Sequence, residues 1–155
     1  MGQQKQNSDT AARPQLPTLP CACANLRRAA RAITRFYNRE LRKARIEITQ
    51  LTLLMTFDQA GEVTQGKLAK LLGLDSTSLT RMLAPLTKRG WIQEKQGNDR
   101  RFRLLQLTAA GRARLQQAMP HWRRAQDRLA AKVGEQFMGG LGKVSTRIAG
   151  SLSEA

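Results

Sequence analysis

The stretch 63–107 constrains the fold of this chain most, because it predicts two consecutive short helices followed by a hairpin. Each helix has signals at both ends: a side chain that can accept a hydrogen bond from the first turn, and a glycine that suits the left-handed position after the last turn. The bounding residues are Thr64 and Gly73 for a helix over residues 65–72, and Asp75 and Gly90 for a helix over residues 76–89. The sequence therefore predicts helix, turn and helix in direct succession.

The second predicted helix has one apolar and one polar face. Its apolar residues recur at three- and four-residue spacing, which predicts a buried face made of Leu79, Met82, Leu83 and Leu86. Hydroxyl and cationic side chains dominate the rest of the helix: Ser76, Thr77, Ser78, Thr80, Arg81 and Lys88. Such side chains hydrogen-bond to base edges and phosphates, and a helix N-terminus offers free N–H groups to phosphate. We predict that these residues bind DNA.

A basic hairpin is predicted after this helix. Its strands cover residues 91–95 and 102–107, and its tip contains Gly97-Asn98, a pair that is typical of tight turns. Cations outnumber acids in the segment 88–103, and we predict that four of them bind DNA: Lys95, Arg100, Arg101 and Arg103. A basic hairpin beside a polar-faced helix is the pattern of a winged helix-turn-helix.

Four segments of this region resemble the MarR family of bacterial transcriptional regulators. They are Leu74-Asp75-Ser76-Thr77-Ser78-Leu79-Thr80-Arg81, Leu86-Thr87-Lys88-Arg89-Gly90-Trp91-Ile92, Asn98-Asp99-Arg100-Arg101 and Leu107-Thr108-Ala109-Ala110-Gly111-Arg112. The resemblance implies a homodimer on a palindromic double-stranded DNA operator, with the second helix in the major groove. It also implies that Arg101 enters the minor groove and that Asp99 orients it.

Helices are predicted on both sides of the winged segment. We divide the chain into a flexible tail (1–20), an N-terminal dimerisation helix (21–48), a winged helix-turn-helix DNA-binding domain (49–107) and C-terminal dimerisation helices (108–155). The first helix is expected to reach Arg45, and Thr49 is expected to cap the next. The fold class is thus mainly α, with a small β-hairpin wing. The apolar faces of the terminal helices exceed what one small domain requires, which favours a two-fold dimer interface over an intrachain core.

The charge of the chain favours a polyanionic partner. Lys and Arg number 27 against 11 Asp and Glu, which gives a net charge of +16 and a pI near 11.5. With 41% hydrophobic and 5% aromatic residues, the core is expected to be aliphatic. No apolar run approaches the roughly 20 residues of a membrane span, and no signal peptide pattern begins the chain. We therefore expect a soluble, cytoplasmic protein without a membrane partner.

Enzyme chemistry is not predicted. His121 is the one histidine, and no set of nucleophile, base and orienting group can be assembled around it, so no catalytic residue is assigned. The Cys21-x-Cys23 spacing supplies neither a disulfide framework nor a four-ligand zinc site. We expect no metal and no cofactor.

A stripe of arginines follows one face of the first predicted helix. Its members are Arg27, Arg28, Arg31, Arg35, Arg39, Arg42 and Arg45, which helical periodicity places within about 120° of arc. Three interpretations remain open: a solvated face, a site for an acidic partner or an anionic ligand, and a direct contact with DNA.

Two DNA-binding functions are compatible with these features. One is a sequence-specific repressor or activator that responds to a ligand, and we expect a repressor. The other is an architectural protein that coats nucleic acid without reading sequence. A coating protein needs only Lys and Arg, whereas the second helix begins with hydroxyl side chains that can bond to bases, which favours the regulator.

The family resemblance suggests a small aromatic or phenolic effector that releases the protein from DNA. Such an anion would lie in a cleft between the dimerisation helices and the winged domain. Candidate residues are Tyr37, Phe57 and Trp122 for the lining, and Arg39 and His121 for the anionic group. Each of these also fits an ordinary core or surface position.

Cys23 suggests an alternative signal. It resembles in position the cysteine with which some MarR-family proteins, the organic-hydroperoxide repressors, sense oxidants. Tyr37 matches one tyrosine that bonds to that thiolate, but Ile48 stands where the second is expected and cannot donate a hydrogen bond. We expect Cys23 to be a small buried residue and organic hydroperoxide not to be the main signal. Oxidant sensing through Cys23 remains the alternative.

Overall fold

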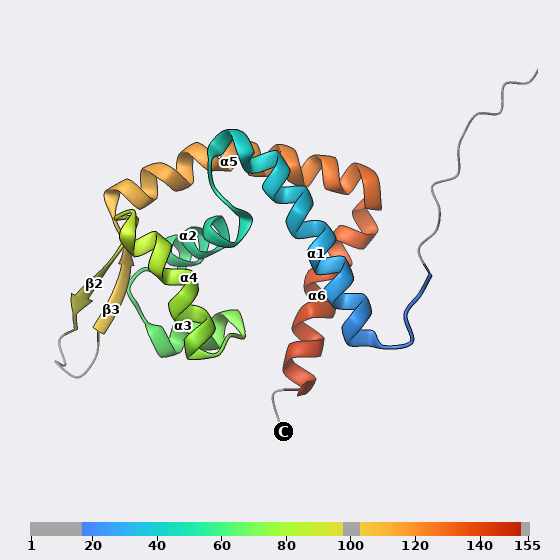
Figure 1. The fold of residues 1–155 in the computed structure, drawn as a ribbon, viewed down its shortest axis with the longest axis horizontal. Helices are drawn as coiled ribbons and strands as arrows, with labels where there is room; N and C mark the ends of the chain where they lie inside the picture. Colours follow the sequence, from blue (N-terminus) through green and yellow to red (C-terminus); the bar gives the residue numbers. More distant parts are fainter. Residues whose placement is uncertain (1–16, 98–102, 153–155) are drawn as a thin grey trace, which may run out of the picture. The chain divides into compact units, whose positions relative to one another are not determined.

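The computed structural model describes residues 17–97 and 103–152, and this part of the chain is mainly helical with one small antiparallel sheet (Figure 1). The elements are α1 (Ala22–Glu40), the 3-10 helix η1 (Leu41–Ala44), α2 (Ile48–Ala60), β1 (Val63–Thr64), α3 (Gln65–Leu72), α4 (Ser76–Lys88), β2 (Ile92–Gln96), β3 (Arg103–Leu107), α5 (Ala109–Val133) and α6 (Glu135–Leu152). This is the mainly helical fold with a small sheet that the sequence predicted.

The chain divides into two compact units, residues 1–33 and 34–155, with the boundary inside α1. In the first unit, Asn25 fastens the start of α1 to the segment before it: its Nδ2 donates to the carbonyl of Leu19 at 2.6 Å, and its Oδ1 accepts from the Leu19 N–H at 3.1 Å. Most of the predicted tail, residues 1–16, lies outside the described residues.

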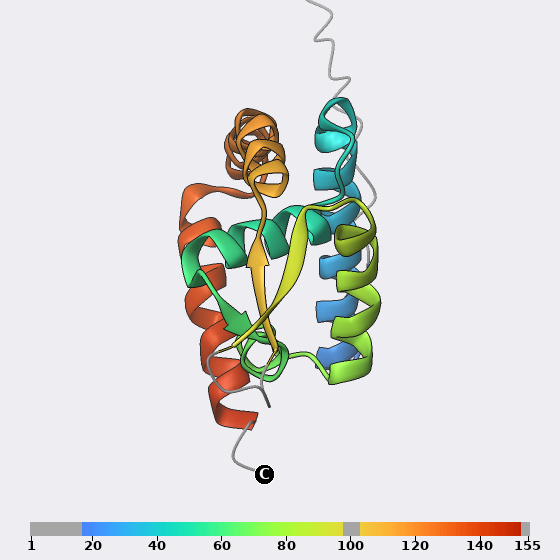
Figure 2. The same cartoon turned by 90° about the vertical axis from the view of Figure 1, so that its left-hand side faces the viewer.

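The second unit contains the helix-turn-helix and a three-stranded sheet. The strand order is β1-β3-β2, with Val63 opposite Leu105 and Ile92 opposite Leu107 (Figure 2). The core beneath it is largely aliphatic, as predicted, and its fully buried members are Leu41, Leu51, Leu53, Leu54, Phe57, Val63, Leu68, Leu79, Leu86 and Ile92.

The N-caps predicted for α3 and α4 are confirmed by hydrogen bonds. The hydroxyl of Thr64 accepts the N–H of Lys67 at 3.3 Å, and Gly73 ends α3 in the left-handed conformation at φ 62°. The carboxylate of Asp75 caps α4, which ends at Lys88 with Gly90 at φ 67° just beyond. Thr108 caps α5 in the same way.

The first helix and the start of the second differ from the prediction. The α-helix ends at Glu40 rather than Arg45, because the chain tightens into η1 and Arg45 takes the left-handed conformation at φ 50°. The N-cap of α2 is Glu47, which forms a capping box with Gln50, and not Thr49. Asn38 stabilises the start of α2, since its Oδ1 accepts the N–H of Ile48 at 2.7 Å.

A close backbone contact joins the sheet to α5. Gly111 lies against the chain at Trp91, and a Cβ at Gly111 would overlap the carbonyl oxygen of Trp91. The N–H of Thr108 donates to the same carbonyl at 3.0 Å, and its hydroxyl donates to the carbonyl of Gly90 at 2.6 Å. Glycine is therefore required where α5 leaves the sheet.

The C-terminal helix α6 has an apolar stripe without cover. None of its residues is buried, and four large apolar side chains along it are exposed by 39–73%: Phe137, Val144, Ile148 and Leu152. The amphipathic helix is confirmed, but its apolar face is not buried by the described residues of the same chain.

Candidate nucleic-acid interface

The two faces of α4 are divided as the sequence predicted. Leu79 and Leu86 are fully buried, Leu83 is buried and Met82 is half-buried. The opposite side is open to solvent, with Ser76, Thr77, Thr80, Arg81 and Lys88 exposed and Ser78 half-buried. The helix therefore packs through leucines and presents hydroxyl and cationic groups outward.

Two of the hydroxyl groups on α4 are already engaged within the protein. Ser78 donates its hydroxyl to Oδ2 of Asp75 at 2.6 Å, while its N–H donates to Oδ1 at 2.8 Å. Thr80 donates to the carbonyl of Ser76 at 2.7 Å and accepts from Nε2 of Gln65 at 2.8 Å. The hydroxyls of these two residues position the helix, so Thr77 and Arg81 are the freer groups for a partner.

The start of α4 is capped by a charged carboxylate. The hydrogen bonds from Ser78 to Asp75, side chain first and backbone second, hold the pKa of the Asp75 carboxyl below its ordinary value. The cap therefore stays charged, which complements the positive end of the helix dipole. Sequence analysis did not identify Gln65, because its contact with Thr80 depends on how α3 packs against α4.

Pro85 lies inside α4 without ending it. Proline removes one N–H from the ladder of a helix, yet α4 continues to Lys88, and the N–H of Arg89 donates to the carbonyl of Pro85 at 3.2 Å. Lys88 is consequently exposed on the last turn of the same helix as Arg81.

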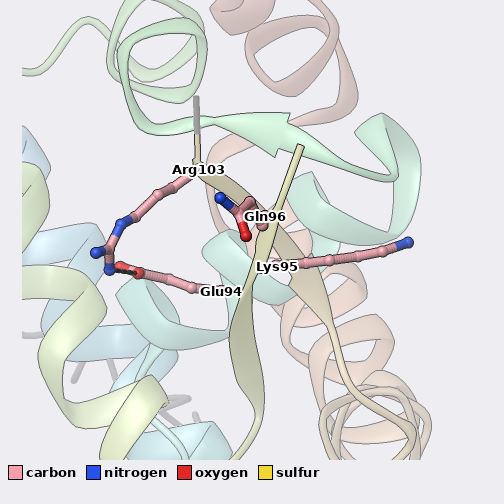
Figure 3. Close-up of a pocket in the computed structure, with 4 residues that line it drawn as sticks. All are labelled: Glu94, Lys95, Gln96 and Arg103. Atoms are coloured by element: carbon pink, nitrogen blue, oxygen red, sulfur yellow. Dashed lines mark hydrogen bonds and ion pairs between the residues drawn. The ribbon is translucent and has the colours of Figure 1, made fainter. Parts of the chain in front are cut away.

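The strands of the hairpin carry two exposed ion pairs near the tip (Figure 3). Arg103 contacts Glu94 at 2.7 Å, and this carboxylate raises the pKa of Arg103, while Lys95 contacts Glu62 at 3.1 Å. Figure 3 shows Lys95 and Arg103 extending in opposite directions from the sheet. Exposed pairs of this kind are weak, about 0–1 kcal/mol, so both cations can exchange their partner for a phosphate. The predicted wing residues Asp99, Arg100 and Arg101 lie outside the described residues.

The predicted effector residues do not converge on one site. Phe57 is 1% exposed in the core. Tyr37 is buried, donates its hydroxyl to Oε1 of Gln126, and burial raises its pKa. Arg39 and His121 do line one pocket of about 610 Å³, but its other walls are charged: Glu40, Lys43, Arg124 and Arg128. Trp122, beside His121 in the sequence, is half-buried.

The expectation that Cys23 is buried is wrong. Cys21 and Cys23 are both exposed. The described part of the first unit, residues 17–33, is one stretch of helix and the short segment before it. These two pieces are too small to bury a side chain.

The described residues contain no group of three or more His, Cys, Asp or Glu side chains that could hold a metal ion. Within the same ranges, no helix combines the length and the apolar composition needed to cross a membrane.

The helices α3 and α4 form a helix-turn-helix that packs on a three-stranded sheet, and β2 and β3 of this sheet form a basic hairpin. This arrangement defines a winged helix-turn-helix protein. The sequence profile of the MarR family matches residues 46–102. The M. tuberculosis transcriptional regulator MosR, solved in complex with DNA, is 34% identical to this chain with a TM-score of 0.69, and the match covers 83% of this chain and 98% of MosR. The chain belongs to the MarR family of transcriptional regulators, which are not enzymes.

Two curated relatives agree with this assignment over part of their length. The multiple antibiotic resistance protein MarR of Salmonella typhimurium is 38% identical over 94 residues, which cover 60% of this chain and 64% of that protein. The transcriptional repressor MprA of Escherichia coli is 34% identical over 86 residues, which cover 54% of this chain and 49% of MprA. The chain thus matches less than two thirds of the length of both relatives.

Proposed function

We propose that this protein is a cytoplasmic transcriptional repressor that binds a palindromic DNA operator. The observation that carries the proposal is α4, whose leucines are buried while Thr77, Arg81 and Lys88 are exposed on the outer side. Helices of this kind enter the major groove and read base edges with hydroxyl and guanidinium groups. The similar protein MosR was solved in complex with DNA, and the similar protein MprA is named a repressor.

The proposed reader is a homodimer. The support is the apolar stripe of α6, where Val144, Ile148 and Leu152 are exposed in the single chain. A second copy would cover such a face, and two-fold symmetry would place two α4 helices on half-sites about one DNA turn apart, roughly 10 base pairs.

The hairpin is proposed to bind beside the major-groove site. Arg101 would enter the minor groove with Asp99 orienting it, while Lys95, Arg100 and Arg103 would contact phosphates. The support is the exposure of Lys95 and Arg103 and the excess of cations in the segment.

Selection of binding sites from random DNA tests the function. We expect an inverted repeat as the best site, and a monomeric footprint or an asymmetric site would refute the dimeric reader. Arg81→Ala should then cost about 1–3 kcal/mol and relax one base position. The matched variant Lys95→Ala should weaken all sequences alike and lower the salt slope by about one unit. A coating protein, the architectural alternative, would show no preferred site.

We propose a small aromatic or phenolic anion as the effector, with Tyr37, Arg39, Phe57, His121 and Trp122 as candidate residues. Among them, Arg39 and His121 have the strongest support, since they line one pocket. Operator release on titration with salicylate, and loss of that response in Arg39→Gln, would be the expected outcome. Salicylate binding that Arg39→Gln leaves unchanged would contradict the assignment.

Oxidant sensing through Cys23 is the second candidate, favoured by the exposure of its thiol. Operator binding is measured against cumene hydroperoxide for the parent, Cys21→Ser and Cys23→Ser. Release of the parent by oxidant with resistance of Cys23→Ser alone would establish thiol sensing in place of the phenolic effector.

A further inference from the structure

Five arginines line one pocket at the junction of α1, η1, α2 and the end of α4. They are Arg35 and Arg39 of α1, Arg42 of η1, Arg45 in the connection to α2, and Arg89 at the C-cap of α4. The pocket is an open depression of about 640 Å³, a volume typical of sites that hold small molecules. The last arginines of α1 thus form a concave site together with arginines of η1, of the connection to α2 and of the C-cap of α4.

Five arginines face a single carboxylate in this pocket. Elsewhere in the described chain arginines find carboxylates, as Arg112 does at Asp58 and Arg128 at Glu40. Within the described ranges none of the five pocket arginines forms an ion pair. The one carboxylate of the lining, Glu47, caps α2 and offsets one of the five positive charges. Like charges gathered in this way repel one another unless an anion joins them.

Arg45 is held in an unusual conformation at this pocket. It is the one non-glycine residue with positive φ in the described ranges, a region that glycine or asparagine would occupy at lower cost. Arg114 fixes it from α5, donating from Nη2 to the carbonyl of Arg45 at 2.7 Å and also to that of Ala44. Burial lowers the pKa of Arg114, and the charges of Arg89 and Arg45 lower it further, so the cations are close. A costly backbone conformation beside a pocket supports a functional role for Arg45.

Arg89 connects the pocket to the proposed reading helix. Its guanidinium donates to Oε1 of Gln50 at 3.2 Å and lies over the ring of Trp91 at 4.9 Å, and its backbone ends α4. Gln50 also lines a neighbouring pocket of about 210 Å³ together with Arg81. An anion that draws Arg89 away from Gln50 would therefore act on the last turn of α4.

We propose that this arginine pocket binds a small anion that carries two or more phosphate-type charges. The planar fork of a guanidinium matches phosphate oxygens in pairs, and several forks around one cavity can share a ligand with several oxygens. A carboxylate or phenolate with one charge would leave most of the pocket uncompensated. Because the site is built chiefly from α1 and η1 rather than from α4, the proposed ligand is a soluble molecule rather than a DNA phosphate.

Direct binding to the DNA-free protein tests the site without reference to the operator. Pyrophosphate, orthophosphate and salicylate are titrated by calorimetry at constant ionic strength. Pyrophosphate should bind most tightly and salicylate most weakly. Arg42→Gln should weaken pyrophosphate about tenfold, the loss of one charge-assisted hydrogen bond. Arg123→Gln on α5, an exposed arginine outside the pocket lining, removes the same charge and should change nothing.

Arg45→Gly separates binding from folding. Glycine suits the left-handed conformation, so this variant should unfold at the temperature of the parent or above it while pyrophosphate affinity falls. Equal pyrophosphate affinity of all variants would overturn the proposal, as would salicylate binding that Arg42→Gln weakens as much as it weakens pyrophosphate binding. It would also be overturned if pyrophosphate does not bind while Arg42→Gln lowers the salt slope of DNA binding, because the pocket would then hold a DNA phosphate.

That the anion regulates transcription rests on the proposed function. Pyrophosphate binding in a protein that ignores DNA would leave the site intact and refute the repressor. Operator binding without pyrophosphate binding would do the reverse, so the two failures are distinguishable.

Discussion

The helices α4 and α6 carry similar amphipathic patterns but differ in what covers their apolar faces. In α4, Leu79 and Leu86 are fully buried against the remainder of the winged domain. In α6, Val144 and Ile148 are exposed by 52% and 39%. The pattern shows that a face needs cover, but it does not show whether the cover comes from the same chain. The winged domain is complete in one chain, whereas α6 depends on the proposed partner.

Core truncation gives the largest expected difference between the two helices. Leu79→Ala should cost about 3 kcal/mol of unfolding free energy, because it leaves a cavity in a closed core. Ile148→Ala should cost little at low protein concentration, where a dimer would be dissociated, and more as the concentration rises. Urea unfolding of both variants and the parent at several concentrations measures this. Concentration-independent unfolding of parent and Ile148→Ala alike would refute the role proposed for α6.

The contact between the sheet and α5 provides the next largest effect. Gly111→Ala forces a Cβ onto the carbonyl oxygen of Trp91, which is backbone and cannot rotate away, so we expect a loss of about 3 kcal/mol. Gly66→Ala is the control, since a Cβ at Gly66 meets nothing within 4 Å inside α3 and should stabilise the helix by up to about 1 kcal/mol. Thermal unfolding compares them. A tolerated Gly111→Ala would mean that α5 can separate from the winged domain.

Local signals predicted the winged domain well for a physical reason. The caps at Thr64, Asp75 and Thr108 each need only residues three or fewer positions away. The leucine spacing of α4 likewise refers to one helix. Prediction failed where the structure depends on residues far along the chain. The first helix was expected to reach Arg45, but Arg114, 69 positions away, holds the carbonyl of Arg45 in the connection before α2.

The candidate site shows the same division. Exposure of Thr77 and Arg81 follows from the helical wheel and is confirmed. The engagement of Thr80 by Gln65, 15 positions away, has no local signature. The arginine pocket shows the division most clearly. The arginine stripe on the first helix is visible in the sequence, but its convergence with Arg89 depends on the turn at η1.

The hydroxyl of Thr108 tests the contact between the sheet and α5 through its hydrogen bonds alone. Thr108→Ala removes the cap that accepts the N–H of Gly111 at 3.0 Å and the donor to Gly90, so we expect a loss of about 1–2 kcal/mol. Thr108→Ser keeps the hydroxyl and should retain most of the stability. Denaturation midpoints of the three proteins provide the measurement, and equal losses in Ala and Ser variants would assign the effect to the methyl group instead.

The smallest expected effect is a pH dependence confined to the winged domain. Bonds from Ser78 lower the pKa of Asp75 in the folded chain from its ordinary value of 3.8, so the unfolded state binds its proton more readily. The stabilisation is therefore fully present above the ordinary pKa and is lost as the pH falls through the lowered folded value. Amide hydrogen exchange should show the first turn of α4 losing protection at acid pH in the parent. Asp75→Asn keeps a capping side chain that does not titrate, so its α4 protection should depend less on pH. The first turn of α5 is capped by the hydroxyl of Thr108, which does not titrate, and provides the internal comparison. An equal acid response in both helices would mean that global unfolding, not the Asp75 cap, is being measured.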